Sequence, residues 1–192
     1  MGQGQLIKAM NDGAQDGDTI IAAAGTPPGN LVNLWNATGG RDCHIEFGYS
    51  CMGYEIPGSI GVRMAQSGGE VYVLVGDGTY LLSPSELVTA VQERLKVTVV
   101  ISENHGFQSI RQLQMDRAGR AFGTEFRDRD PVSGRLEGDY VKLDLAKTAE
   151  GLGAHVWNVS TPEEMRSAMS EAREEKGPCV IVAETHPDRY VP

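Results

Sequence analysis

The sequence predicts a doubly wound α/β fold, in which a parallel sheet of about six strands carries helices on both faces. Six short strand-like runs alternate along the chain with segments whose apolar residues recur at helical spacing. This alternation is typical of parallel sheets that bind ligands at the carboxyl ends of their strands. The chain has 192 residues and no repeat or low-complexity linker. We therefore expect a single domain over residues 1–192.

The expected elements follow from hydrophobic periodicity and from turn and capping signals. Strands are expected at 19–24, 44–47, 71–75, 97–101, 155–159 and 179–183. Helices are expected at 6–14, 31–35, 56–65, 83–95, 143–152 and 162–176. Capping boxes at Ser83–Glu86 and Thr161–Glu164 predict two of the helix starts. Trp35, Trp157 and the methionines at helical spacing, including Met64 beside Ile60, are expected in the core.

Residues 108–140 differ from the rest of the chain, because arginines and acidic residues are interleaved there and few positions are apolar. We expect an irregular helix followed by a long loop. The loop could be a mobile lid or only a solvated connection.

Composition narrows the classes of function. The formal net charge is −9, with Lys and Arg scattered along the chain, which argues against a nucleic-acid or anionic-membrane surface. Cysteines occur at positions 43, 51 and 179 without regular spacing, and no targeting or membrane-spanning pattern is present. An odd cysteine count of this kind predicts reduced thiols and a cytoplasmic protein.

Two strand ends carry the residues best suited to chemistry. Gly76-Asp77-Gly78 follows the run 71–75, and Asn104-His105-Gly106 follows 97–101. If these runs are neighbouring parallel strands, Asp77 and Asn104 converge at one edge of the sheet. Carboxylate and amide oxygens are ligands that Mg²⁺ accepts while phosphate and water fill its other positions. We therefore expect a magnesium site there.

Other interpretations of the Gly76–Gly78 motif are weaker. A hairpin turn would need a second strand, but a helix pattern follows. A dinucleotide fingerprint would need glycine where Leu81 stands, and the chain has no P-loop motif. Gly78 would let the backbone approach a phosphate and Thr79 adds a hydroxyl group. His105 could contact substrate, but a structural loop histidine is the favoured interpretation because Mg²⁺ does not prefer imidazole.

The motif Gly76-Asp77-Gly78, followed after a helix and a strand by Asn104 and Gly106, resembles the metal and diphosphate motif of thiamine-diphosphate enzymes. The segment Phe47–Gly58 resembles their companion motif. The resemblance implies Mg²⁺ ligands at Asp77, the side chain of Asn104 and the carbonyl of Gly106. It implies cofactor contacts at Gly25, Thr26, Ser50, Met52, Gly76, Gly78, Thr79 and Phe107, with Met52 bending the cofactor and the Ser50 carbonyl meeting its aminopyrimidine.

Within these enzymes, three segments resemble the trihydroxycyclohexanedione hydrolases of myo-inositol breakdown. They are AAAGTPPGNLVNLW, EFGYSCMGYEIPGSIG and GDGTYLLSPSELVTAVQE. That resemblance implies cleavage of a carbon–carbon bond in a cyclic 1,2-dione with uptake of water. It also implies a separate pyrimidine-binding domain, whose glutamate activates the cofactor. Nothing in this chain matches that domain, so no catalytic residue is assigned and the chain alone is expected to be inactive.

Other functions share part of this pattern. Acetolactate synthases and 2-oxoacid decarboxylases have the same cofactor motifs, and substrate tests would separate them. A non-catalytic binding module, or a doubly wound domain without cofactor, is a further alternative. The expected partners are a small-molecule substrate, a pyrimidine-binding domain or subunit and further copies of the chain in a homo-oligomer, with no nucleic acid or membrane.

Overall fold

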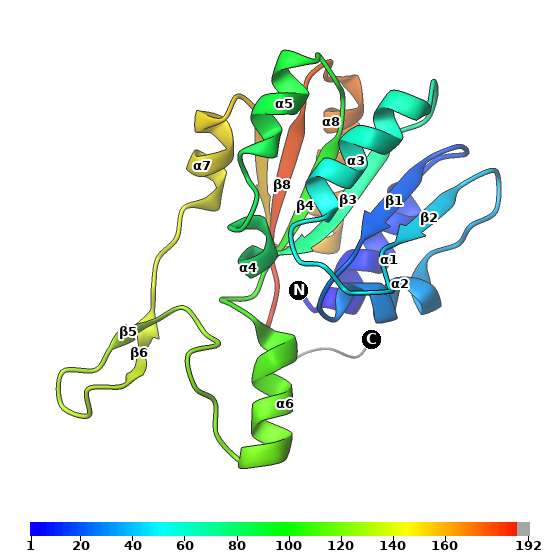
Figure 1. Cartoon of the computed structure of the whole chain (residues 1–192). Helices are drawn as coiled ribbons and strands as arrows, with labels where there is room; N and C mark the ends of the chain where they lie inside the picture. The colour runs from blue at the N-terminus through cyan, green and yellow to red at the C-terminus, as the bar shows by residue number, and fades with distance from the viewer. Residues whose placement is uncertain (188–192) are drawn as a thin grey trace.

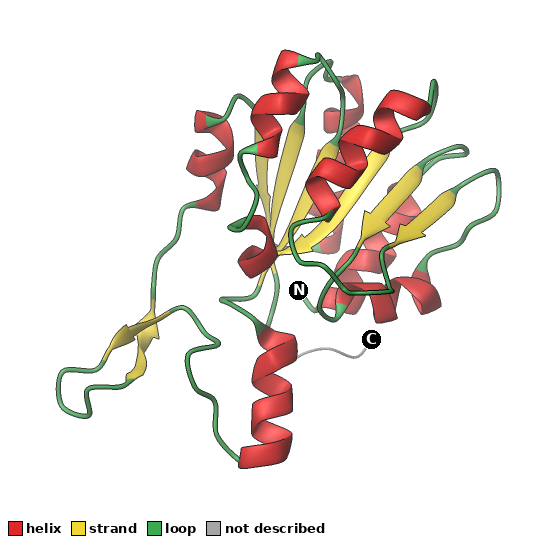
Figure 2. Cartoon of the chain, viewed as in Figure 1, coloured by secondary structure: helices red, strands yellow, loops and turns green. Residues whose placement is uncertain are grey.

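A computed structural model of the chain describes residues 1–187 and contains the expected α/β sheet. The main sheet has six strands, all parallel, in the order β2-β1-β3-β4-β8-β7 (Figures 1 and 2). The strands are β1 Thr19–Ala22, β2 Asp42–Ile45, β3 Val71–Gly76, β4 Thr98–Glu103, β7 His155–Val159 and β8 Cys179–Glu184. All six lie where the sequence predicts them, with ends that differ by up to two residues.

Helices cover both faces of this sheet, as a doubly wound fold requires. One face packs against α1 (Gln3–Gly13), α2 (Pro27–Leu34) and α8 (Pro162–Glu174). The other packs against α3 (Glu55–Ala65), α4 (Asp77–Tyr80), α5 (Glu86–Gln92) and α7 (Leu145–Gly151). The central strands β3, β4 and β8 are buried along all but their last residue, and most of their side chains are apolar, as in a sheet covered on both faces.

The strand order places a topological switch at the centre of the sheet. From β1 the chain passes to β2 on one side, whereas from β3 it passes to β4 on the other. The loops that leave β1 and β3 therefore diverge and open a crevice at the carboxyl edge. The tips after β3 and β4 lie side by side there, since Gly76 is paired with Ser102 in the ladder.

Several local predictions are corrected by the structure. The expected capping box at Ser83–Glu86 does not form: residues 81–85 make turns, and α5 begins at Glu86 without a side-chain cap on Ser85. Helix α2 begins at Pro27, four residues earlier than expected. Met64 is 59% exposed although Ile60 on the same helix is buried. In contrast, the capping box at Thr161–Glu164 is present.

The segment 108–140 is more regular than predicted. It contains α6 (Gln108–Ala118), which ends on Gly119 in the left-handed conformation, and an antiparallel hairpin of β5 (Arg127–Arg129) and β6 (Leu136–Tyr140). Figure 1 shows α6 and this hairpin projecting beyond the carboxyl edge of the sheet. Within residues 1–187, no helix is long and apolar enough to cross a bilayer.

Candidate functional site

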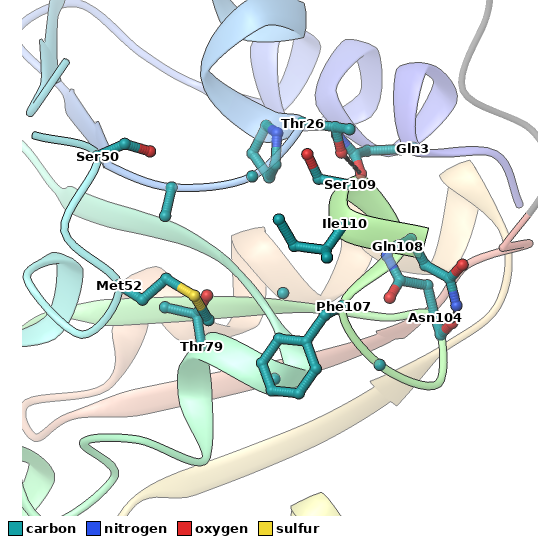
Figure 3. Close-up of a pocket in the computed structure, with 16 residues that line it drawn as sticks. Gln3, Thr26, Ser50, Met52, Thr79, Asn104, Phe107, Gln108, Ser109 and Ile110 are labelled. Atoms are coloured by element: carbon teal, nitrogen blue, oxygen red, sulfur yellow. Dashed lines mark hydrogen bonds between the residues drawn. The ribbon is translucent and has the colours of Figure 1, made fainter. Parts of the chain in front are cut away.

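A cavity of about 240 Å³ lies at the carboxyl edge, between the loops that leave β1, β3 and β4 (Figure 3). The structure brings all eight predicted cofactor residues into its wall: Gly25, Thr26, Ser50, Met52, Gly76, Gly78, Thr79 and Phe107. Two of the three predicted metal ligands, Asn104 and Gly106, also line it. The sequence motifs thus converge on one cavity, although they come from four separate stretches of the chain.

Asp77 lies beneath this wall and is 1% exposed. Its carboxylate accepts hydrogen bonds from the backbone amides of Asn104 (2.9 Å), Gly106 (3.1 Å to Oδ1) and Gly78 (2.6 Å). The carboxylate therefore fixes the tip after β4 to the tip after β3. Burial raises the pKa of Asp77 to about 6, against the opposing effect of these amide bonds. A cation beside it would offset that cost of burial.

The side chain of Asn104 has an oxygen free for such a cation. Asn104 is 7% exposed, and its buried Oδ1 has no hydrogen-bond partner among the described residues. The Gly106 carbonyl accepts one hydrogen bond, from the Gln108 amide at 3.1 Å, so it retains a lone pair. Residues 1–187 contain no cluster of three or more His, Cys, Asp or Glu that would hold a metal. A metal here would therefore use one carboxylate with neutral oxygens, which suits Mg²⁺.

Phe107 and Gly78 form the floor of the cavity. The ring of Phe107 lies so close to Gly78 that a Cβ atom there would come within 2.6 Å of it. We expect Gly78→Ala to lower the free energy of unfolding by about 1–3 kcal/mol, because the half-buried Phe107 ring must shift. Chemical denaturation would measure this change.

Gly76→Ala is the matched control in the same motif. No described heavy atom lies within 4 Å of a Cβ built at Gly76, whose φ of −79° suits alanine. The control should change stability by less than about 0.5 kcal/mol. Equal stability losses in the two variants would contradict the contact between Gly78 and Phe107.

Residues 124–126 form a strap behind the tip that carries Asn104 and Gly106. The Phe107 amide donates to the Thr124 carbonyl at 2.7 Å, and the Phe126 amide donates to the His105 carbonyl at 3.0 Å. Gly106 and Glu125 are paired between these two bonds. The strap therefore holds residues 105–107 in a short antiparallel ladder.

Glu125 ties this strap to α6 and to the hairpin. Its carboxylate accepts a hydrogen bond from the Tyr140 hydroxyl at 2.8 Å and lies 3.2 Å from Arg111 and 3.3 Å from Arg127. Burial alone would raise the pKa of Glu125, but contacts with Arg127, Tyr140 and Arg111 outweigh it and lower this pKa. His105 has a φ of 64° and stacks on Tyr140 at 4.2 Å between centroids. His105 also lines a neighbouring cavity. Its ring thus packs against the hairpin and supports the loop after β4.

Glu55 links the other two loops of the site. It is 1% exposed, and its oxygens accept the backbone amides of Ala24 at 3.1 Å and Gly53 at 3.0 Å. Burial raises the pKa of its carboxyl. The residue thereby holds the loop after β1 against the loop that carries Ser50 and Met52.

Sequence reasoning missed six residues of the cavity wall: Gln3, Ala24, Pro27, Gln108, Ser109 and Ile110. Ala24 and Pro27 flank the predicted Gly25 and Thr26 and could have been included by position. The side chains in the first turns of α1 and α6 carry no motif. Only the packing of both helices at the carboxyl edge brings them to the cavity.

The raised pKa of Asp77 predicts a pH dependence in metal-free buffer. Because the pKa moves from 3.8 to about 6 on folding, the folded chain binds more protons than the unfolded chain between these values. The contribution of Asp77 to stability therefore falls as pH rises from about 4 to about 6, by roughly 3 kcal/mol. Urea denaturation of wild type and Asp77→Asn across this range would measure it. A difference between the two proteins that does not vary with pH would contradict the shift.

Comparisons with known proteins agree with this geometry. Residues 23–183 match the family described as thiamine pyrophosphate enzyme, C-terminal TPP binding domain. The chain is also similar to proteins named 3D-(3,5/4)-trihydroxycyclohexane-1,2-dione hydrolase. It is 39% identical to the one from Clostridium tetani over 174 residues, which are 91% of this chain and 27% of that protein. It is 41% identical to the one from Geobacillus thermodenitrificans over 170 residues, 88% of this chain and 27% of that protein.

These matches cover most of this chain but only a part of each relative. The chain spans about a quarter of the length of the curated relatives that it matches. The family match covers most of the chain and includes the loops after β1, β3 and β4 that form the cavity. The chain therefore belongs to the thiamine pyrophosphate enzymes, in which it corresponds to the C-terminal TPP-binding domain.

Proposed function

We propose that the edge cavity binds thiamine diphosphate through Mg²⁺. The observation that carries this proposal is the buried, unpartnered Oδ1 of Asn104, which lies at the tip that Asp77 holds by backbone hydrogen bonds. In a TPP-binding family, this donor set fits a hard cation that accepts carboxylate and neutral oxygens. Asp77, the Asn104 side chain and the Gly106 carbonyl would hold the metal.

The remaining residues would hold the organic part of the cofactor. Gly76, Gly78, Thr79 and Phe107 lie on the strand tips where a diphosphate would meet backbone amides, and Gly25 and Thr26 face them across the cavity. Met52 and Ser50 enter from the loop before α3. We assign Met52 to bending the cofactor and the Ser50 carbonyl to its aminopyrimidine. Glu55 would position both loops.

We infer that the whole enzyme is a hydrolase that cleaves a carbon–carbon bond of a cyclic 1,2-dione, trihydroxycyclohexanedione, in inositol breakdown. The names of relatives about 40% identical to this chain support this inference. Thiamine diphosphate supplies, when bound, an electron sink for bond cleavage next to a carbonyl group. This chain's residues bind and orient the cofactor, while a pyrimidine-binding domain would add the activating glutamate. We expect the assembled enzyme to be a cytoplasmic homo-oligomer.

An activity assay tests which substrate the enzyme uses and whether activity requires a pyrimidine-binding domain. The chain would be assayed alone and joined to a pyrimidine-binding domain, with trihydroxycyclohexane-1,2-dione and with pyruvate as substrates. We expect turnover of the dione only by the joined protein. Turnover of pyruvate instead would favour an acetolactate synthase or decarboxylase activity, and efficient turnover by the chain alone would contradict the requirement for a second domain.

A further inference from the structure

Three side-chain amides in the wall of the edge cavity each have one buried atom without a partner among residues 1–187. These atoms are Asn104 Oδ1, Gln108 Oε1 and Gln3 Nε2. A buried polar group left without a partner costs about 1–3 kcal/mol, which indicates that a ligand satisfies it. Asn104 and Gln108 offer acceptors, as a metal and its water require. Gln3 offers a donor, which a metal cannot use.

Gln3 is held in place for a ligand rather than for its own helix. It is the first residue of α1 and is 3% exposed. The Thr26 hydroxyl donates to Gln3 Oε1 at 3.0 Å, so Nε2 is the free end of the amide (Figure 3). The start of α1 is capped by another side chain, because the Gly2 amide donates to Gln5 Oε1 at 2.9 Å. Capping therefore does not explain why Gln3 is buried.

The position of Gln3 determines which part of the cofactor its side chain can reach. Two residues earlier, Met1 lines the same neighbouring cavity as His105, the residue next to Asn104. The Met1 carbonyl accepts the His186 amide at 2.8 Å, which ties this segment to the end of β8. Gln3 thus enters the site from the side of the β4 tip, where the metal ligands lie. The acceptor-rich group expected at that end is the diphosphate.

We propose that Gln3 is a diphosphate-binding residue, whose Nε2 donates a hydrogen bond to a phosphate oxygen while Thr26 orients the amide. The proposal rests on the proposed binding of thiamine diphosphate in this cavity and adds a helix to the set of groups that bind it. A hydrogen bond to a charged oxygen contributes more than one between neutral groups. Loss of the donor should therefore be measurable as lower affinity.

Calorimetric titration of the chain with Mg²⁺ and either pyrophosphate or thiamine diphosphate tests this contact. Gln3→Met keeps the size of the side chain but removes the donor. We expect it to weaken both ligands by similar factors, about tenfold or more. Gln15→Met is the matched control, because Gln15 is exposed, and it should bind both ligands as wild type does. Circular dichroism would check that both variants fold.

The outcomes separate this inference from the proposed function. Wild-type affinity of Gln3→Met for both ligands would overturn the role of Gln3 but leave the cofactor site intact. A loss for thiamine diphosphate alone would overturn the diphosphate contact. No binding by wild type would overturn both proposals. If Gln3→Met does not fold, the assigned side-chain amide signals of Gln3 in the wild-type NMR spectrum should shift on addition of Mg²⁺ and pyrophosphate, and unchanged signals would overturn the contact.

Discussion

Asp77→Ala should abolish Mg²⁺-dependent binding of thiamine diphosphate, with a loss of affinity of at least about a hundredfold. The substitution removes the one carboxylate among the proposed metal ligands. It also leaves the amides of Gly78, Asn104 and Gly106 without their acceptor, so both strand tips lose their connection. Unsatisfied buried amides cost about 1–3 kcal/mol each, so stability should fall as well. Calorimetry would measure affinity and thermal unfolding would measure stability.

A control for charge is Asp139→Ala, because Asp139 is exposed on β6 of the hairpin. This variant has the same net charge as Asp77→Ala and should bind the cofactor as wild type does. If Asp77→Ala bound thiamine diphosphate with unchanged affinity in the presence of Mg²⁺, Asp77 would not be a metal ligand.

Gly106→Ala should be among the most destabilising single substitutions in the chain. A Cβ atom there would come within 2.5 Å of the Thr124 carbonyl oxygen and 2.9 Å of Glu125 Cα. Both are backbone atoms, so no side chain can rotate away. The φ of 135° at Gly106 also disfavours alanine. We expect a loss of about 3 kcal/mol or more, measured by urea denaturation, together with weaker cofactor binding.

Gly119→Ala separates the backbone clash from the cost of a positive φ. Gly119 has a φ of 65°, and none of the described atoms lies within 4 Å of its added Cβ. It should cost only about 1–2 kcal/mol. If Gly106→Ala were no more destabilising than Gly119→Ala, the close contact of the strap 124–126 with Gly106 would be contradicted.

The main sheet could be predicted because its strands are buried and uninterrupted by charge. Runs such as 71–75 and 97–101 are apolar at every position or nearly so, and each ends at a glycine or polar tip. The hairpin was missed for the opposite reason. Residues Arg127–Arg129 and Leu136–Tyr140 are mostly polar and half-exposed or exposed. Contacts of Glu125 with Arg127 and Tyr140, rather than an apolar face, hold the hairpin to the strap.

The cavity wall could be predicted where its residues belong to sequence motifs, and the structure explains why two of these motif residues are glycines. Gly78 is required because the Phe107 ring leaves no room for a side chain, and Gly106 because the strap approaches its backbone. Glutamine on a helix gives no such signal. Gln3 and Gln108 lie in the first turns of α1 and α6, and only the tertiary arrangement buries them against the cavity.

The central claim is that Asp77 and Asn104 together bind a divalent metal that holds a diphosphate. The most direct test is anomalous diffraction from crystals of the chain grown with Mn²⁺ and thiamine diphosphate, since Mn²⁺ shares the oxygen ligands of Mg²⁺. We expect one strong anomalous peak in contact with the Asp77 carboxylate, Asn104 Oδ1 and the Gly106 carbonyl, with the diphosphate bound to it. A diphosphate bound elsewhere, or a metal that contacts neither Asp77 nor Asn104, would contradict the account.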